Sequence, residues 1–114
     1  MQSQTQAQIQ QVEISIEHAR EMVKRGKQAQ LLADNPDFKS VVIEGYFRDE
    51  AARLAHLASD PGIDQNTRDA VYRDLTAPGA FKRYLHAVIH FGRMAEDDIE
   101  QGSLMLDELR TEEA

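Results

Sequence analysis

The longest regular pattern in the chain is a row of apolar or small residues, at steps of four and three, from residue 81 to residue 109. Two such positions in every seven are typical of a helix that packs along another helix. The pattern therefore predicts a long C-terminal helix with a narrow packing seam. The seam positions are Phe81, Leu85, Val88, Gly92, Ala95, Ile99, Gly102, Leu106 and Leu109.

The glycines of this seam have two interpretations. Glycine inside a helix is about 1 kcal/mol less favourable than alanine, so Gly92 and Gly102 need a compensating role. They could accommodate bulky side chains of the same chain, such as Tyr46 or Phe47, or they could let another helix approach closely at a protein–protein interface. After Gly102 we find no further element in the chain to cover the apolar residues, which favours an interface there.

The N-terminal residues also allow two interpretations. Residues 1–11 are rich in Gln and contain few apolar side chains, which is typical of a mobile arm. Residues 12–17 alternate apolar and polar as an extended strand would, yet Ile9, Val12 and Ile16 also fit a helix. Ser15 is a suitable N-cap, so we expect an extended or flexible arm over 1–14 and a helix from Ile16 to about residue 33.

Turn-forming residues divide the rest of the chain. Asn35 and Pro36 suit a helix start, and the broad apolar content of 36–59 predicts a helix in the middle of the core. Pro61 and Gly62 end it, a short helix follows at 64–75, and Pro78 and Gly79 precede the long helix at 79–110. The fold class expected is all-α: a small four-helix domain over 15–110, an N-terminal arm over 1–14 and an acidic tail over 111–114.

Composition narrows the function. The chain has 114 residues, a net charge of −7 and no cysteine, so disulfides and thiolate chemistry are excluded. A net acidic surface is repelled by nucleic acid and by anionic membranes, and we expect neither as a partner. No apolar stretch approaches the roughly 18 residues of a membrane span, which indicates a protein in the cytoplasm of the cell that makes it.

Charge is unevenly distributed along the predicted helices. The C-terminal helix has its bases in the first half and its acids in the second, the reverse of what the helix dipole favours. A solvated surface explains this, but so does a partner helix of opposite charge. Laid antiparallel, the basic cluster of residues 20–27 would meet the acids of residues 96–100, within one chain or between two.

The sequence contains no recognisable catalytic motif. His86 and His90 are four residues apart, as some metal ligands are, but no carboxylate lies between them. A zinc site would need a third ligand from Glu44, Glu50 or His56. We find neither a nucleophile motif nor a glycine-rich phosphate loop. We therefore expect no enzyme activity, cofactor or bound metal.

Three segments carry a resemblance to a known group of proteins. They are the run NPDFKSVVIEGYFRDEAARL, the preceding QVEISIEHAREMV and the later YLHAVIHFGRMAEDDIE, which together cover about residues 11–100. The sequence here resembles small, largely uncharacterised proteins of tailed bacteriophages. The resemblance carries no assigned active site; it implies a phage context, with a role in the virion or its assembly.

These observations predict a non-enzymatic bacteriophage structural or assembly protein. It would act through coiled-coil-like self-association, as a homo-oligomer, or by docking on another phage protein, in the host cytoplasm or within the virion. The alternative is an acidic phage protein that binds and inhibits a host enzyme. The expected partner interface consists of Val12, Ile14, Ile16, Ile99, Gly102, Leu104, Leu106 and Leu109.

Overall fold

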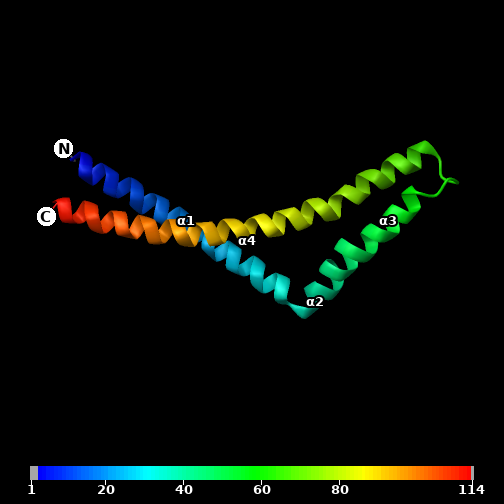
Figure 1. Cartoon of the computed structure of the whole chain (residues 1–114), viewed down its shortest axis with the longest axis horizontal. Coiled ribbons are helices and arrows are strands. Elements are labelled where there is room, and N and C mark those ends of the chain that lie inside the picture. The colour runs from blue at the N-terminus through cyan, green and yellow to red at the C-terminus, as the bar shows by residue number, and fades with distance from the viewer. Residues whose placement is uncertain (1–2, 114) are drawn as a thin grey trace. The chain divides into compact units, whose positions relative to one another are not determined.

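Two interruptions, at Asn35 and at the turn after Ala58, divide the chain into three continuous helical stretches (Figure 1). The structure, a computed structural model, describes residues 3–113. The first stretch is α1, Gln4–Asp34; the second joins α2, Pro36–Phe38, to η1, Lys39–Glu50, and α3, Ala51–Ala58; the third is α4, Gln65–Glu113. Residues 3–113 contain no strand, so the predicted all-α class is confirmed.

The number of helices differs from the four expected. The helices predicted at 64–75 and 79–110 form one 49-residue helix, α4, with Pro78 in its interior. Proline lacks the N–H that would bond to the carbonyl of Asp74, but its fixed φ is compatible with a helix. The ring of Pro78 is buried. The helix continues on both sides of this buried residue, although its sequence made a break the expectation.

The arm expected over residues 1–14 is also corrected. Residues from Gln4 onward are helical and belong to α1, while residues 1 and 2 lie outside the described part. The reason is a packing partner: Val12 and Ile16 contact the position of Gly102 on α4, and this contact favours the helical spacing over the strand-like one. At the other end α4 continues through the predicted tail to Glu113, and Ala114 lies outside the described residues.

The chain forms two compact units. Unit 1 combines residues 1–29 with residues 88–114, and unit 2 comprises residues 30–87. The helix α4 contributes its second half to unit 1 and its first half to unit 2. The single domain expected over 15–110 stays a prediction.

Unit 2 has a core of large aliphatic side chains. Leu54, Ala58 and Val71 are buried, with Leu57 and Leu75 packed against them, so α3 and the first turns of α4 lie side by side. Arg68 closes the turn by donating from Nε to the carbonyl of Ala58, 3.1 Å, and from Nη2 to that of Asp60, 3.0 Å.

The helical stretch from Pro36 begins as its sequence predicts but then departs from an ordinary α-helix. Asn35 Oδ1 accepts hydrogen bonds from the backbone N–H groups of Asp37, 2.9 Å, and Phe38, 3.0 Å, with Pro36 at the first helical position. The following η1 is a 12-residue π-helix, whose hydrogen bonds span five residues instead of four.

We expected residues 36–59 to lie in the middle of the core. This expectation is wrong for η1, because none of its residues is buried. The Phe47 ring packs against the Phe81 ring at a centroid distance of 5.3 Å, but both side chains stay partly exposed. The buried contribution of this stretch comes from α3 alone, through Leu54 and Ala58.

Candidate protein interface

Unit 1 is an antiparallel pair of helices. Position 26 of α1 faces position 92 of α4, and position 16 faces position 102, so the two helices run in opposite directions. Figure 1 shows the start of α1 beside the end of α4. Ser3 Oγ donates a hydrogen bond of 2.7 Å to Glu113 Oε1, which joins the two ends of the pair. The antiparallel arrangement expected from the charge pattern is therefore present.

The contact between the helices is closest at two glycines. A Cβ added to Gly26 would lie 2.9 Å from the Cα of Gly92, and a Cβ added to Gly92 would lie 2.9 Å from the Cα of Gly26. Neither residue can therefore carry a side chain without moving the backbone of the other helix. Ala19 and Ala95 are also buried, and Ala95 is only 1% exposed. Neither interpretation of the seam glycines describes Gly92: it allows a helix to approach closely, but that helix is α1 of the same chain and not a partner protein, and the residue it faces is Gly26 and not Tyr46 or Phe47.

Further along the pair a larger side chain fills the space above glycine. A Cβ on Gly102 would lie 2.9 Å from Cγ1 of Ile16 and 3.7 Å from Cγ1 of Val12. Ile16 and Leu106 are buried. The C-terminal half of α4 is thus covered by α1, and our expectation that no element remained to cover it is corrected.

The eight residues of the expected partner interface consequently have different environments. Ile14 and Leu104 are exposed, by 69% and 61%. The other six are buried or partly buried and lie on the seam spacing within unit 1; they are Val12, Ile16, Ile99, Gly102, Leu106 and Leu109. That any of the eight contacts another protein stays a prediction.

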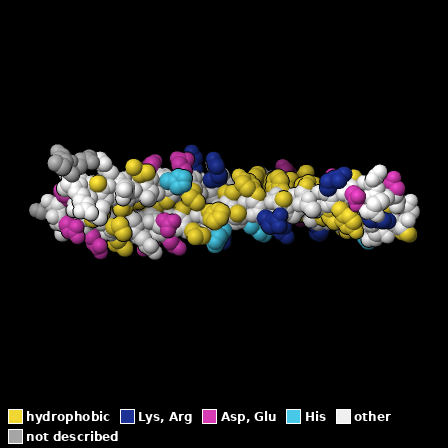
Figure 2. Space-filling view, turned by 90° about the horizontal axis from the view of Figure 1, so that it is seen from above, with side chains coloured by type: hydrophobic (Ala, Val, Ile, Leu, Met, Phe, Trp, Pro, Cys, Tyr) yellow, Lys and Arg dark blue, Asp and Glu magenta, His cyan; other side chains and the backbone are white. Residues whose placement is uncertain are grey.

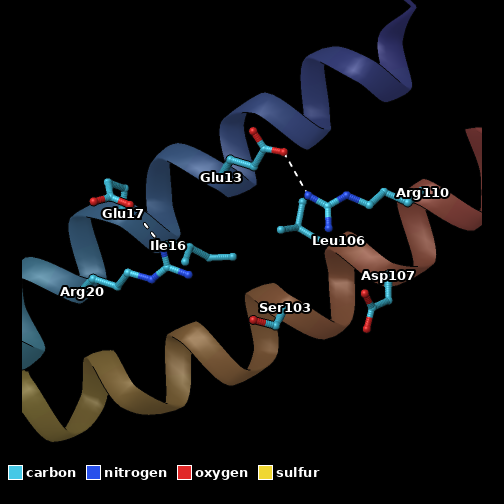
Figure 3. A pocket seen from close by; sticks show the side chains of 8 residues that line it. All are labelled: Glu13, Ile16, Glu17, Arg20, Ser103, Leu106, Asp107 and Arg110. Carbon is cyan, nitrogen blue, oxygen red and sulfur yellow. Dashed lines mark hydrogen bonds and ion pairs between the residues drawn. The ribbon is translucent and has the colours of Figure 1, made fainter.

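One side of the helix pair is charged. A groove of about 530 Å³ lies there. Figure 3 shows the charged and polar side chains that line it together with Ile16 and Leu106. Arg110 Nη2 lies 3.1 Å from Glu13 Oε1 across the two helices, and Arg20 pairs with Glu17 of its own helix at 3.3 Å. Among residues 3–113, no ion pair joins the basic cluster of residues 20–27 to the acids of residues 96–100. The pairing expected there is therefore not made within the chain.

The opposite side is mostly uncharged and is named here the Met105 side. It has a groove of about 690 Å³. Around the seam, this groove is lined by Gln11, Ile14, Ser15, His18 and Met22 of α1 and by Asp98, Gln101 and Met105 of α4. Phe91 and Met94 precede Asp98 by seven and four residues, so helical spacing places them on this side of α4. Both are 49% exposed, and Met105 is 51% exposed.

The surface of unit 1 therefore combines exposed apolar groups with acidic ones. Figure 2 shows apolar side chains at the surface among acidic ones, in the part of the view where the acidic side chains gather. Large apolar groups that cluster at a surface, surrounded by polar ones, indicate a site for another protein. The sequence pattern pointed to the seam and to the apolar residues after Gly102, Met105 among them, whereas Phe91 and Met94 of the exposed flank were missed.

The groups with altered pKa lie in unit 2. Hydrogen bonds from Thr67 lower the pKa of the Asp64 carboxyl, and the hydrogen-bonded ion pair with Arg53 lowers that of Glu50. Asp64 caps the start of α4, with its Oδ1 2.9 Å from the Thr67 nitrogen. These shifts have their causes in a helix cap and an ion pair between neighbouring turns, so they indicate structural roles.

The histidine pair lies at the surface. His86 and His90 are both exposed, and residues 3–113 contain no group of three or more potential metal ligands placed to hold an ion. Among the helices described, none combines the length and apolar character needed to cross a membrane.

Comparison with family models, with curated proteins and with solved structures gave no match for this chain. The candidate interface is therefore derived from its own residues.

Proposed function

We propose that the chain is a non-enzymatic bacteriophage structural or assembly protein that acts through helix-mediated self-association or by docking on a protein partner. The phage context derives from the resemblance of residues 11–100 to small phage proteins. The mode of action derives from unit 1, whose two long helices lie close together and keep large apolar side chains outside their seam.

The observation that carries the proposal is the exposure of these side chains. Phe91, Met94 and Met105 lie on one side of α4, each about half exposed, beside a groove between two helices. Helices commonly recruit further helices through such apolar flanks, with anchors three, four and seven residues apart. A long helical pair with one apolar and one charged side suits a protein that assembles with others.

Two measurements test the proposal. Light scattering behind size exclusion should give the full chain a mass above the 12.9 kDa of one copy, or should give a defined complex with a protein of the same phage. Quantitative mass spectrometry of purified particles and of assembly intermediates should find the chain in a fixed ratio to the other components. The proposal would be contradicted if the chain were a monomer that forms no complex with another phage protein and were absent from purified particles and from assembly intermediates.

The acidic surface favours the second candidate, a phage protein that inhibits a host enzyme by imitating the charge of nucleic acid. Glu96, Asp97, Asp98 and Glu100 are all exposed on α4. This candidate predicts that stoichiometric amounts of the chain abolish the activity of one nucleic-acid-binding host enzyme, and that salt relieves the inhibition. Inhibition that persists after charge reversal at Asp97 and Asp98 would contradict charge imitation.

A further inference from the structure

We infer that the Met105 side of unit 1 binds a second copy of this chain, with each α1 lying against the partner's α4. This inference rests on the proposed self-association and names its surface and its partner. Two antiparallel pairs joined in this way form a four-helix bundle related by a two-fold axis, in which the same surface serves both copies.

The apolar groups of this side are suited to bundle formation. Phe91, Met94 and Met105 are each about half exposed, and Met22 lines the groove from α1. Methionine adapts its flexible side chain to an irregular surface, so a groove flanked by several methionines accepts an opposing helix without demanding one shape. In a bundle these side chains would form the layer between the two pairs.

The charges of the two helices identify the partner as another copy. Residues 1–29 carry four basic and three acidic side chains, whereas residues 88–114 carry two basic and eight acidic ones. These counts cover whole helices, including Arg20 and Arg110 of the charged side. A partner complements them when it places an acidic helix against α1 and a less acidic one against α4. A second copy of unit 1 provides both.

Charge also selects the arrangement within the bundle. If each α1 is adjacent to the partner's α4, the two acidic helices lie on a diagonal, at the largest separation available in four helices. If α4 is adjacent to α4, its acids face one another, and like charges at close range are destabilising. The first arrangement also provides the acids of α4 with the basic partner that they lack within the chain.

Two charged residues mark the contact. Asp98 lines the groove from α4, and Arg25 follows Gln11 and His18 of the groove at seven-residue intervals on α1. Both are exposed. In the arrangement inferred, Arg25 of each copy lies on the side that meets the partner's acidic helix.

Substitution at Met105 tests the surface. Sedimentation equilibrium should give the wild-type chain about twice the 12.9 kDa of one copy. Met105→Lys would place a charge in the apolar layer, so we expect the dimer dissociation constant to rise about tenfold or more. Ser103→Lys is the matched control: it introduces the same side chain two residues away on the charged side, and it should leave the dissociation constant within about twofold.

Charge exchange tests the arrangement. Arg25→Glu and Asp98→Lys should each weaken the homodimer several-fold, because each places like charges in both contacts between copies. An equimolar mixture of the two variants should form a heterodimer tighter than either homodimer, since its contacts are again between opposite charges. Contacts within one chain cannot account for such a recovery, because mixing leaves them unchanged.

The outcomes separate this inference from the proposed function. If the wild-type chain is a dimer and neither Met105→Lys nor Arg25→Glu changes its dissociation constant, the Met105 side is not the dimer interface, but self-association stands. If the mixture of Arg25→Glu and Asp98→Lys chains forms no tighter heterodimer, α1 does not lie against the partner's α4. A wild-type monomer overturns the inference entirely, and the proposed function then depends on docking with a different phage protein. Far-UV circular dichroism should be the same for all variants, since every substituted side chain is exposed.

Discussion

The two units of this chain bring helices together by opposite means. In unit 1 the contact is made by the smallest residues, Gly26 and Gly92, and the helices approach until the backbones touch. In unit 2 large aliphatic side chains such as Leu54 and Val71 fill the space between α3 and α4. The same helix, α4, takes part in both.

The difference concerns which side chains hold each unit together. In unit 1 small residues make the closest contact, and large side chains of α4 such as Phe91, Met94 and Met105 lie outside it at the surface. In unit 2 large side chains make the contact, although others such as Val41, Tyr72 and Tyr84 stay exposed there as well. We therefore expect stability to depend most on single side chains in unit 2, and association to depend most on unit 1.

Truncation of the unit 2 core should have the largest effect. Leu54 is 6% exposed, and Leu54→Ala should lower the free energy of unfolding by about 2–5 kcal/mol, because it removes buried surface and leaves a cavity. Urea unfolding measures the loss, and hydrogen exchange should locate it mainly in residues 30–87. Leu104→Ala, at a position 61% exposed, should change the free energy by less than about 0.5 kcal/mol. Equal losses of unfolding free energy for Leu54→Ala and Leu104→Ala would contradict the expectation that stability depends most on the side chains of the unit 2 core.

The second largest effect on stability is expected from adding one methyl group to a glycine of α4, and its sign should differ between the two units. Gly92→Ala would place a Cβ 2.9 Å from the Gly26 backbone, and we expect a loss of about 1–3 kcal/mol from the forced separation of the helices. Gly79→Ala is the control in the unit 2 part of the same helix. A Cβ there has no atom within 4 Å, so the higher helix propensity of alanine should stabilise the chain by up to about 1 kcal/mol. Thermal unfolding of both variants should show shifts of opposite sign.

Removal of a helix cap should have a smaller effect. Asn35→Ala eliminates the acceptor of two backbone N–H groups and should cost about 1 kcal/mol, whereas Asn35→Asp keeps an acceptor and should cost less. The measurement is urea unfolding, with hydrogen exchange at Asp37 and Phe38. Unchanged exchange at these two amides in the alanine variant would show that the cap contributes nothing.

The smallest effect is expected from pH. Because Thr67 lowers the pKa of Asp64 in the folded chain below its ordinary value of 3.8, the ionised carboxylate favours folding. This contribution is complete above the unfolded pKa, and it is lost as the pH falls through the lower folded value. Asp64→Asn should therefore weaken the acid dependence of unfolding below about pH 4. An acid limb identical to that of the wild type would exclude the contribution.

Local signals in the sequence were sufficient for part of the fold. The cap at Asn35, the turn at Pro61 and Gly62 and the seam of the long helix all depend on residues close together in the chain, and all are present in the structure. Pro78 shows the limit of such signals. A proline followed by glycine normally ends a helix, but α4 continues on both sides of this buried residue.

The remaining differences depend on contacts between distant residues. Residues 12–17 satisfy both a strand period and a helix period, and the choice depends on the contact with Gly102, about ninety positions away in the sequence. Likewise, the seam pattern identifies which residues of α4 pack but not which helix they pack against. We expected a partner protein where α1 of the same chain lies, and the exposure of Phe91 and Met94 became evident only in the structure. The π-helical geometry of η1 has no sequence signal that we can identify.

The hydrogen bond between Ser3 and Glu113 has a topological consequence. Positions 3 and 113 are close enough for a linker of a few residues to join them covalently, and the exposed turn at Gly62 offers a place for new termini. A circularly permuted chain of this kind would begin at α4, and α4 and α1 would become neighbours along the chain as they are in space. The two helices of unit 1 would then be connected by a short loop, as the two helices of a simple hairpin are.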